Sequence, residues 1–212
     1  MCLMTYFLKA QYSPEAMISH EHKFIFIHIP KCAGTTIETV FNCWENKYTE
    51  KYYHLDDNKQ HHFISEILEA YPDCNHYYKF SFVRNPWSRF LSEYHYMIAK
   101  SLLPPNFSFE NFCLHKEVIA EYGWPYHDKS QHEFIFDSNG DSLIDFVGKL
   151  ENIQQDFNVI CDKIGIPHQE LPHKNKSKHK HYTEYYDDET REIVAEKYAR
   201  DIEYFGYKFG EY

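Results

Sequence analysis

Short uninterrupted apolar runs along the chain are followed by segments in which apolar residues recur with helical spacing. The run Phe24–Ile29 is aromatic and β-branched, and only His28 interrupts it. An apolar run without alternation is typical of a strand that is covered on both faces, as in a parallel sheet. One helical stripe follows it at Ile37, Val40, Phe41 and Trp44. The pattern predicts a buried strand followed by an amphipathic helix.

The same succession recurs further along the chain. Tyr77–Val83 is a second apolar run, and Asn85 and Pro86 follow it closely. These residue types favour the N-cap and the first position of a helix. The apolar stripe of this helix comprises Trp87, Phe90, Leu91, Tyr94 and Ile98. Two strand–loop–helix units predict an α/β fold in three layers, α/β/α, with a central, mostly parallel sheet.

The remaining pattern is that of one domain over residues 1–212, without a linker, a repeat or a low-complexity block. Further helices are predicted around Phe63–Tyr71, Asn106–Glu121, Glu151–Ile164 and Glu189–Arg200. Two short runs, Gln131–Phe136 and Leu143–Val147, are strand-like. These elements complete the layers on either side of the sheet.

The loop after the first strand has the residue types of an anion-binding site. Pro30 ends the strand, Lys31 adds a positive charge, and Gly34 permits a tight turn that leaves room for a ligand. Thr35 and Glu38 fit a capping box, so the helix would offer unpaired amides to an anion. The nucleotide triphosphatase loop G-x-x-x-x-G-K-[ST] places its lysine after the last glycine, unlike this one. The sequence thus favours a phosphate site of another type, with a plain capped turn as the simpler alternative.

The second loop repeats this chemistry with an arginine. Arg84 stands at the end of the second strand, and Ser92 lies two turns into the helix on a face shared with Ser88 and Tyr96. Arg84 and Ser92 can therefore meet on one anion, although an ordinary salt bridge and a solvated serine would also explain them. Ligands of open α/β sheets bind at such strand ends. The two loops together favour one doubly charged ligand.

Two motifs carry a resemblance to a known family. The run HIPKCAGTT at residues 28–36 resembles the 5′-phosphosulfate loop of sulfotransferases that use 3′-phosphoadenosine 5′-phosphosulfate (PAPS). The run FVRNPWSRFLSEY at residues 82–94 resembles their 3′-phosphate motif. The chain is most similar to sulfotransferase family 2, the carbohydrate branch with heparan 2-O- and chondroitin-type enzymes. The resemblance implies a P-loop-like fold and transfer of a sulfuryl group from PAPS to an acceptor hydroxyl, with no metal.

The resemblance also implies roles for individual residues. The expected donor-binding residues are Lys31, Cys32, Ala33, Gly34, Thr35, Thr36, Arg84 and Ser92. Lys31 would also stabilise charge on the leaving oxygen. His62 precedes Arg84 by a spacing similar to that of the general base in these relatives, which makes it the expected base. His61 is a close competitor, and His54 is a weaker one.

The charge and the aromatic residues of the chain indicate which molecules it could bind. The net charge is −10 with histidine neutral, which argues against a general nucleic-acid binder. The one dense basic run, Lys174–His181, is either a solvated loop or a flap over the donor or acceptor. The expected acceptor is a glycan or glycolipid. Trp124 and Tyr126 could stack on a sugar, although core packing is the simpler role.

Six cysteines without metal-binding spacing, no secretory segment and no apolar run long enough for a membrane span lead us to expect free thiols and a cytoplasmic location. Two other functions remain open on the sequence alone. One is a P-loop-like phosphotransferase with an unusual loop, and the other is a non-catalytic module that binds a nucleotide or another anion.

Overall fold

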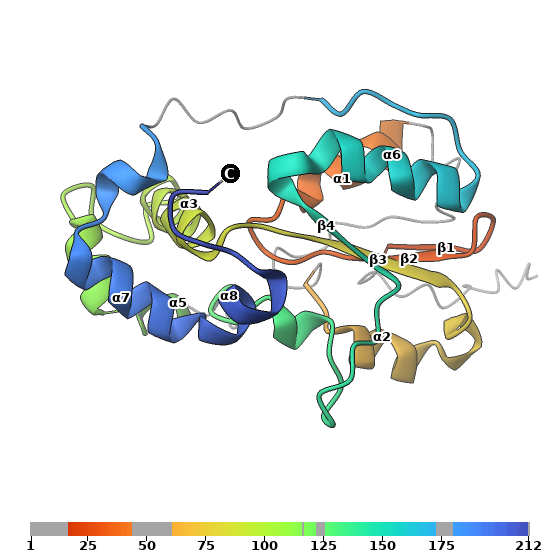
Figure 1. The fold of residues 1–212 in the computed structure, drawn as a ribbon, viewed down its shortest axis with the longest axis horizontal. Helices are drawn as coiled ribbons and strands as arrows, with labels where there is room; N and C mark the ends of the chain where they lie inside the picture. Colours follow the sequence, from red (N-terminus) through yellow and green to blue (C-terminus); the bar gives the residue numbers. More distant parts are fainter. Residues whose placement is uncertain (1–16, 44–60, 116, 122–125, 173–179, 212) are drawn as a thin grey trace, which may run out of the picture.

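The structure is a computed structural model that describes residues 17–43, 61–115, 117–121, 126–172 and 180–211. Within these residues a four-stranded sheet has the order β1-β2-β3-β4 (Figure 1). Its strands are β1 (Met17–Ser19), β2 (Phe24–Ile27), β3 (Tyr78–Val83) and β4 (Phe146–Lys149). Strands β2, β3 and β4 are parallel, and β1 runs antiparallel to β2. The loops that leave the three parallel strands therefore meet at one edge of the sheet.

Helices cover the sheet, and further helices lie beyond one end of it (Figure 1). The α-helices of the described residues are α1 (Gly34–Cys43), α2 (Ile64–Ala70), α3 (Pro86–Ala99), α4 (Phe109–Leu114), α5 (Val118–Glu121), α6 (Ile153–Ile164), α7 (Asp188–Lys197) and α8 (Ala199–Phe205). Short 3-10 helices are η1 (Pro72–Cys74), η2 (His132–Phe134), η3 (Leu150–Asn152) and η4 (Tyr182–Tyr185).

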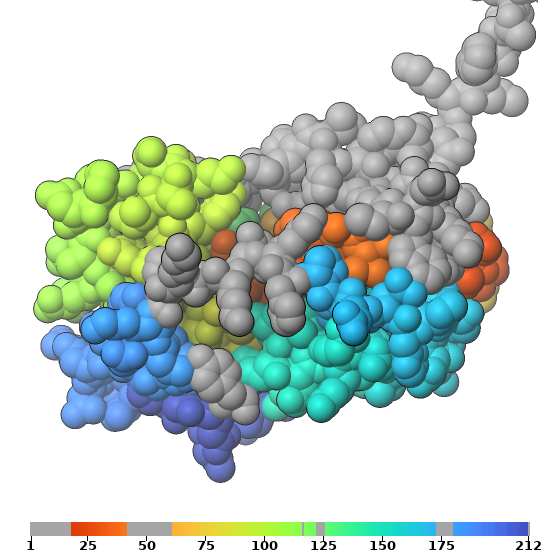
Figure 2. All heavy atoms as spheres, turned by 90° about the horizontal axis from the view of Figure 1, so that it is seen from above, coloured from red at the N-terminus to blue at the C-terminus, as the bar shows by residue number. Residues whose placement is uncertain are grey.

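Both faces of the sheet are buried. Phe24 and Phe26 of β2 pack with α1 and α6 on one face, whereas Ile25 and Ile27 pack with α2 and η2 on the other. Successive strand residues point to opposite faces, so an unbroken apolar run feeds two cores at once. Figures 1 and 2 show α1 and α6 together on the same side of the sheet. The predicted three-layer α/β/α class with a P-loop-like strand–loop–helix unit is confirmed.

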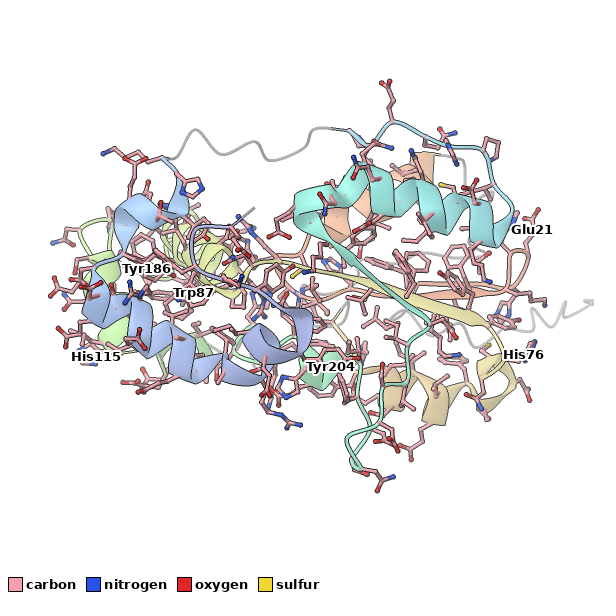
Figure 3. The ribbon with its side chains drawn as sticks, in the orientation of Figure 1. Glu21, His76, Trp87, His115, Tyr186 and Tyr204 are labelled. Carbon is pink, nitrogen blue, oxygen red and sulfur yellow. The ribbon has the colours of Figure 1, made fainter. Side chains whose placement is uncertain are left out.

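A cluster of helices, here called the helical lobe (α3, α4, α5 and α7), extends from the carboxyl ends of the strands. Its core contains Trp87, Phe90 and Tyr198. The Tyr186 hydroxyl donates to the Trp87 carbonyl oxygen at 2.8 Å. Figure 3 places Trp87 and Tyr186 in this lobe, at the end of the molecule opposite to Glu21. Because α3 begins directly after β3, the lobe forms one wall beside the sheet edge where the loops meet.

The start of α3 follows the sequence prediction, since the Asn85 side chain caps it by accepting from the Ser88 amide, and Pro86 is its first residue. Two other predictions are wrong. The helix predicted over Asn106–Glu121 is broken, and α4 ends at Leu114. The strand predicted over Gln131–Phe136 contains η2 instead, because a carboxylate of α8 accepts from the amides of Gln131 and His132, and strand-like pairing is limited to an isolated bridge between Phe136 and Ser142.

Candidate functional site

The loop between β2 and α1 forms a small concave nest of backbone amides. Lys31 and Ala33 have φ angles of 66° and 65°, in the left-handed region, on either side of Cys32. Alternation of this kind turns successive amides toward one point and favours an anion there. Within the described part of the chain, the amides of Ala33, Gly34 and Thr35 make no hydrogen bond. They lie at the positive end of α1, so this nest is suited to a phosphate or sulfate group.

Two of the predicted donor-binding positions use their amides within the protein. The Cys32 amide donates to the Ile29 carbonyl oxygen at 3.3 Å, and the Thr36 amide donates to that of Ala33 at 2.9 Å. Thr35 is exposed at the mouth of the nest, whereas the Thr36 side chain is buried. The nest thus depends on fewer amides than the sequence implied.

Gly34 is required for a reason other than a tight turn. A Cβ atom at Gly34 would lie 1.9 Å from Cδ2 of His28. The His28 ring is buried beneath the start of α1, and its Nδ1 donates to Glu38 Oε1. The predicted capping box between Thr35 and Glu38 is therefore wrong, because the Glu38 carboxylate turns inward to His28. This pair packs under the nest and supports it from the sheet side.

The two predicted cations lie together. Arg84 Nη1 donates to the Lys31 carbonyl oxygen at 3.4 Å, and Arg84 Nε donates to Ser88 Oγ at 3.0 Å. Lys31 Nζ stands 4.0 Å from the centroid of the Tyr96 ring. Ser92 lies half-buried one turn beyond Ser88 on the same face of α3. The ends of β2 and β3 thus present two cations and the hydroxyl-bearing face of α3 to one space.

Burial affects the charge of Lys31. It lowers the pKa of the Lys31 ammonium below the usual 10.5, and the Arg84 and Arg89 guanidinium groups lower it too. The negative charge of Glu93 acts in the opposite direction. A partly desolvated cation binds an anion more strongly than an exposed one, because less water screens the interaction.

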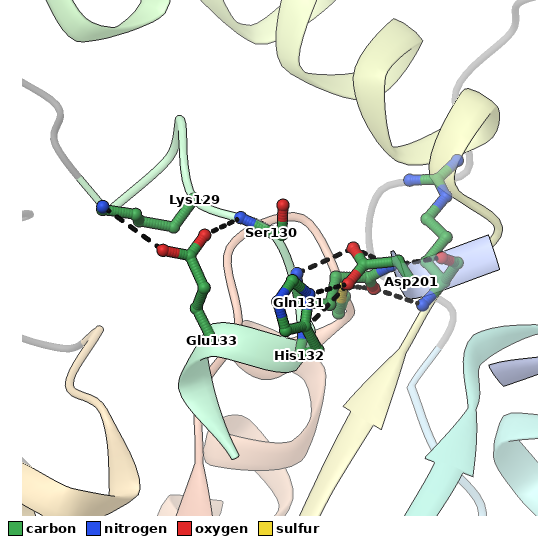
Figure 4. A network of polar contacts seen from close by, with 8 residues as sticks. Lys129, Ser130, Gln131, His132, Glu133 and Asp201 are labelled. Atoms are coloured by element: carbon green, nitrogen blue, oxygen red, sulfur yellow. Dashed lines mark hydrogen bonds and ion pairs between the residues drawn. The ribbon is translucent and has the colours of Figure 1, made fainter. Parts of the chain in front are cut away.

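Gln131 joins the two loops, and the sequence analysis did not identify it. Its Oε1 accepts from the Arg84 amide at 2.8 Å and from Cys32 Sγ at 3.1 Å, while its Nε2 donates to the Arg84 carbonyl oxygen at 2.9 Å. Asp201 of α8 holds Gln131 by accepting from its amide at 2.8 Å, and also accepts from His132 (Figure 4). A buried amide with every polar atom engaged fixes its neighbours in place. No local pattern marks such a residue.

Cys32 takes part in this clamp as a thiol. Burial raises its pKa to about 12, although Arg89 and Arg84 oppose the shift. The side chain is therefore an uncharged hydrogen-bond donor to Gln131 at neutral pH, and is not a nucleophile. The Cys32 side chain therefore holds the donor loop in shape through its hydrogen bond to Gln131.

Arg89 is a second residue that the sequence analysis missed. The guanidinium is buried in α3, and its Nε donates to the Pro30 carbonyl oxygen at 3.0 Å. Its Nη2 donates to the His127 carbonyl oxygen at 3.5 Å. Arg89 therefore ties the nest to the helical lobe. Its position in the apolar helix face, one turn after Asn85, is the signal that could have identified it.

The two candidate bases occupy different environments. His61 is 3% exposed, and its Nδ1 donates to the His28 carbonyl oxygen at 2.9 Å. Burial lowers its pKa well below 6.5, and so do His28 and His127 nearby. The His62 side chain is 17% exposed, and its Nδ1 lies 3.2 Å from Glu66 Oε2. Nδ1 is the engaged nitrogen in each ring, and Nε2 of His62 is buried within the protein.

Several predicted positions lie outside the described residues. They are Trp44, His54, Trp124 and most of the basic run Lys174–His181. Tyr126 is described, and its ring centroid lies 5.8 Å from that of His62 and 5.5 Å from that of Phe63. This aromatic wall stands beside the candidate base.

No helix in the described ranges is long and apolar enough to cross a membrane. Residues 17–43, 61–115, 117–121, 126–172 and 180–211 also contain no group of three or more histidine, cysteine or acidic side chains arranged to hold a metal ion.

The chain resembles known proteins over most of its length. A model of the sulfotransferase family matches residues 14–208. An uncharacterized protein of Archaeoglobus fulgidus is 28% identical over 93 residues, which are 43% of this chain and 70% of that protein. A sulfotransferase from Alicyclobacillus acidocaldarius is 17% identical, with a TM-score of 0.40 over 66% of this chain. The match spans 56% of that solved chain.

Proposed function

The chain belongs to the sulfotransferase family, and from this premise we propose that it transfers a sulfuryl group from PAPS to a hydroxyl group of a carbohydrate, on a glycan or glycolipid. The observation that supports PAPS as the donor is the approach of Arg84 Nη1 to the Lys31 carbonyl oxygen at 3.4 Å. This contact places the amide nest and Lys31 next to Arg84 and the two serines of α3, Ser88 and Ser92. PAPS carries charged groups on both sides of one ribose, and this pair of sites fits them.

The residues around the nest fit the 5′-phosphosulfate. Three amides of the nest make no hydrogen bond within the described residues, and Lys31 adds a positive charge beside them. Arg84, Ser88 and Ser92 supply donors for the 3′-phosphate. Sulfuryl transfer, like phosphoryl transfer, needs in-line geometry and stabilisation of charge on the leaving oxygen. Lys31 and the start of α1 would supply that stabilisation while the S–O bond to the phosphate breaks.

His62 is the base that we propose. The acceptor hydroxyl gives its proton to the His62 imidazole as its oxygen bonds to sulfur, and adenosine 3′,5′-bisphosphate leaves. Glu66 holds Nδ1 of the ring at 3.2 Å and stabilises the imidazolium that forms. His62 also stands beside Tyr126 and Phe63, whose rings can pack against the apolar face of a sugar. His61 is the alternative base, set deeper against the end of β2.

Donor identity is tested by binding and by transfer. Adenosine 3′,5′-bisphosphate is expected to bind in a calorimetric titration with the same affinity with and without Mg²⁺, and at least about tenfold more tightly than ATP, since only one of these nucleotides has a 3′-phosphate. Labelled PAPS is then offered with glycans, glycolipids and tyrosyl peptides. Tight ATP binding that requires Mg²⁺ would instead favour a phosphotransferase. Binding of the bisphosphate without transfer to any acceptor would favour a non-catalytic module.

The choice of base is tested by single substitutions and by pH. His62→Ala is expected to lower kcat by about 10²–10⁴-fold, the usual contribution of a general base, with donor affinity unchanged. His61→Ala is expected to lower the free energy of unfolding and to leave kcat of the folded protein nearly unchanged, because the His61 ring is buried between His28 and His127. If His61 were the base, kcat would fall only as pH drops well below 6.5, through its lowered pKa. Loss of turnover in His61→Ala together with such a profile would reverse the assignment.

A further inference from the structure

Lys31 stands at the top of a column of side chains that ends in a buried carboxylate. Its Nζ lies 4.0 Å from the centroid of the Tyr96 ring. The Tyr96 ring is stacked on the His127 ring, with centroids 5.8 Å apart and planes at 25°. His127 Nδ1 donates to Glu93 Oε2 at 2.9 Å. We call Tyr96, His127 and Glu93 the Lys31 column.

The carboxylate at the foot of the column is unusual for its position. Glu93 is 3% exposed in the middle of α3, and His127 is 7% exposed. Burying a carboxylate costs free energy that its hydrogen bonds only partly return. Replacing a buried charged pair by apolar residues is often neutral or stabilising, so a buried carboxylate is weak evidence of a role in folding. Its negative charge is the property that requires an explanation.

The charges around Lys31 supply one. The titratable and charged groups around it are Glu93, Arg84, Arg89 and Cys32, with the Tyr96 ring below it and His127 and His61 beyond. Lys100 also approaches the Tyr96 ring, with its Nζ 5.7 Å from the centroid. Cys32 is an uncharged thiol at neutral pH, as its raised pKa of about 12 shows. Two guanidinium groups and burial therefore oppose a charge on Lys31. Glu93 is the main negative charge that favours it.

We propose that Glu93, through His127 and Tyr96, is a positioning residue that keeps the Lys31 ammonium charged and seated on the Tyr96 ring before the donor binds. The electron-rich face of Tyr96 attracts the ammonium and sets its place above the nest. Glu93 lies deep enough to balance the charge of Lys31 without occupying the anion site. When the donor arrives, its phosphate takes over this balance. The consequence for catalysis rests on the proposed function, but the charge state of Lys31 does not.

Glu93→Gln tests the proposal, because the amide oxygen can still accept from His127 while the charge is removed. In protein labelled with ¹³C-lysine, the Lys31 resonance is identified by its loss in Lys31→Arg. We expect this resonance to titrate at lower pH in Glu93→Gln than in the wild type. Adenosine 3′,5′-bisphosphate is expected to bind Glu93→Gln roughly tenfold more weakly than the wild type at a pH between the two measured Lys31 titrations, where only the wild-type ammonium keeps its proton. At pH 6.5 its affinity should be equal or higher, since a negative charge near the anion has gone.

The controls separate this role from a purely structural one. Glu110→Gln, on the exposed face of α4, should change neither measurement. Tyr96→Leu should lower the pH at which the Lys31 resonance titrates, whereas Tyr96→Phe should not. This pair of variants tests the seat of the Lys31 ammonium on the ring even if Glu93→Gln does not fold. An unchanged Lys31 titration in Glu93→Gln, or an equal loss of affinity at both pH values, would overturn the proposal. If the wild type does not bind the nucleotide, the proposed donor is wrong, and the lysine titration still decides the role of Glu93.

Discussion

Lys31→Met is expected to lower kcat for sulfuryl transfer by about 10²–10³-fold, the usual loss when one preorganised charge at the leaving group is removed. Methionine keeps the unbranched shape and most of the length of the side chain, and it occupies the φ angle of 66° no worse than lysine does. The nest should therefore retain its shape. Turnover of labelled PAPS with the acceptor found in the screen gives kcat, and calorimetry gives the affinity for adenosine 3′,5′-bisphosphate, which should fall less.

Lys100→Met is the matched control for this prediction. Lys100 Nζ lies 5.7 Å from the centroid of the same Tyr96 ring, but Lys100 is exposed beyond the end of α3. Its removal should leave kcat within about twofold, because water screens an exposed charge. If Lys31→Met kept a third or more of the wild-type kcat, Lys31 would not be the group that stabilises the leaving oxygen. If both variants lost activity equally, the effect would come from the general field of the surface.

Gly34→Ala is expected to reduce the free energy of unfolding by at least about 3 kcal/mol. Its methyl group would lie 1.9 Å from His28 Cδ2 and 2.0 Å from Nε2, so the ring must move. Overpacking a core costs about 1–3 kcal/mol, and displacing one member of a buried pair costs about 3–5 kcal/mol. His28 cannot move without releasing Glu38. Chemical denaturation of the variant and the wild type measures the difference.

Gly165→Ala separates the effect of space from that of backbone conformation. Gly165 has a φ angle of 74° at the end of α6, with no atom within 4 Å of an added Cβ. Gly165→Ala should lower the free energy of unfolding only by the strain of alanine in a left-handed backbone conformation, about 1–2 kcal/mol. A cost for Gly34→Ala no larger than that for Gly165→Ala would contradict the packing of His28 under the nest.

Much of the architecture follows from local sequence. The apolar runs that predicted β2 and β3 are buried on both faces, and Asn85 and Pro86 begin α3 as their types favour. Each signal acts over a few neighbouring residues, through side-chain periodicity or a capping hydrogen bond. The strand predicted over Gln131–Phe136 is wrong because Asp201, 70 residues after Gln131, binds its backbone. A periodic pattern contains no information about a partner so far along the chain.

The sequence by itself determined the family, the two loops at the strand ends and the two cations that they carry, because these depend on residue order over short spans. Only the tertiary structure decided how the site is held. It assigned the left-handed positions to Lys31 and Ala33, engaged Gln131 between the loops, and placed a carboxylate below Lys31. These features arise where segments distant in the chain exclude water together. Their energies depend on burial and on neighbours that no single stretch of sequence specifies.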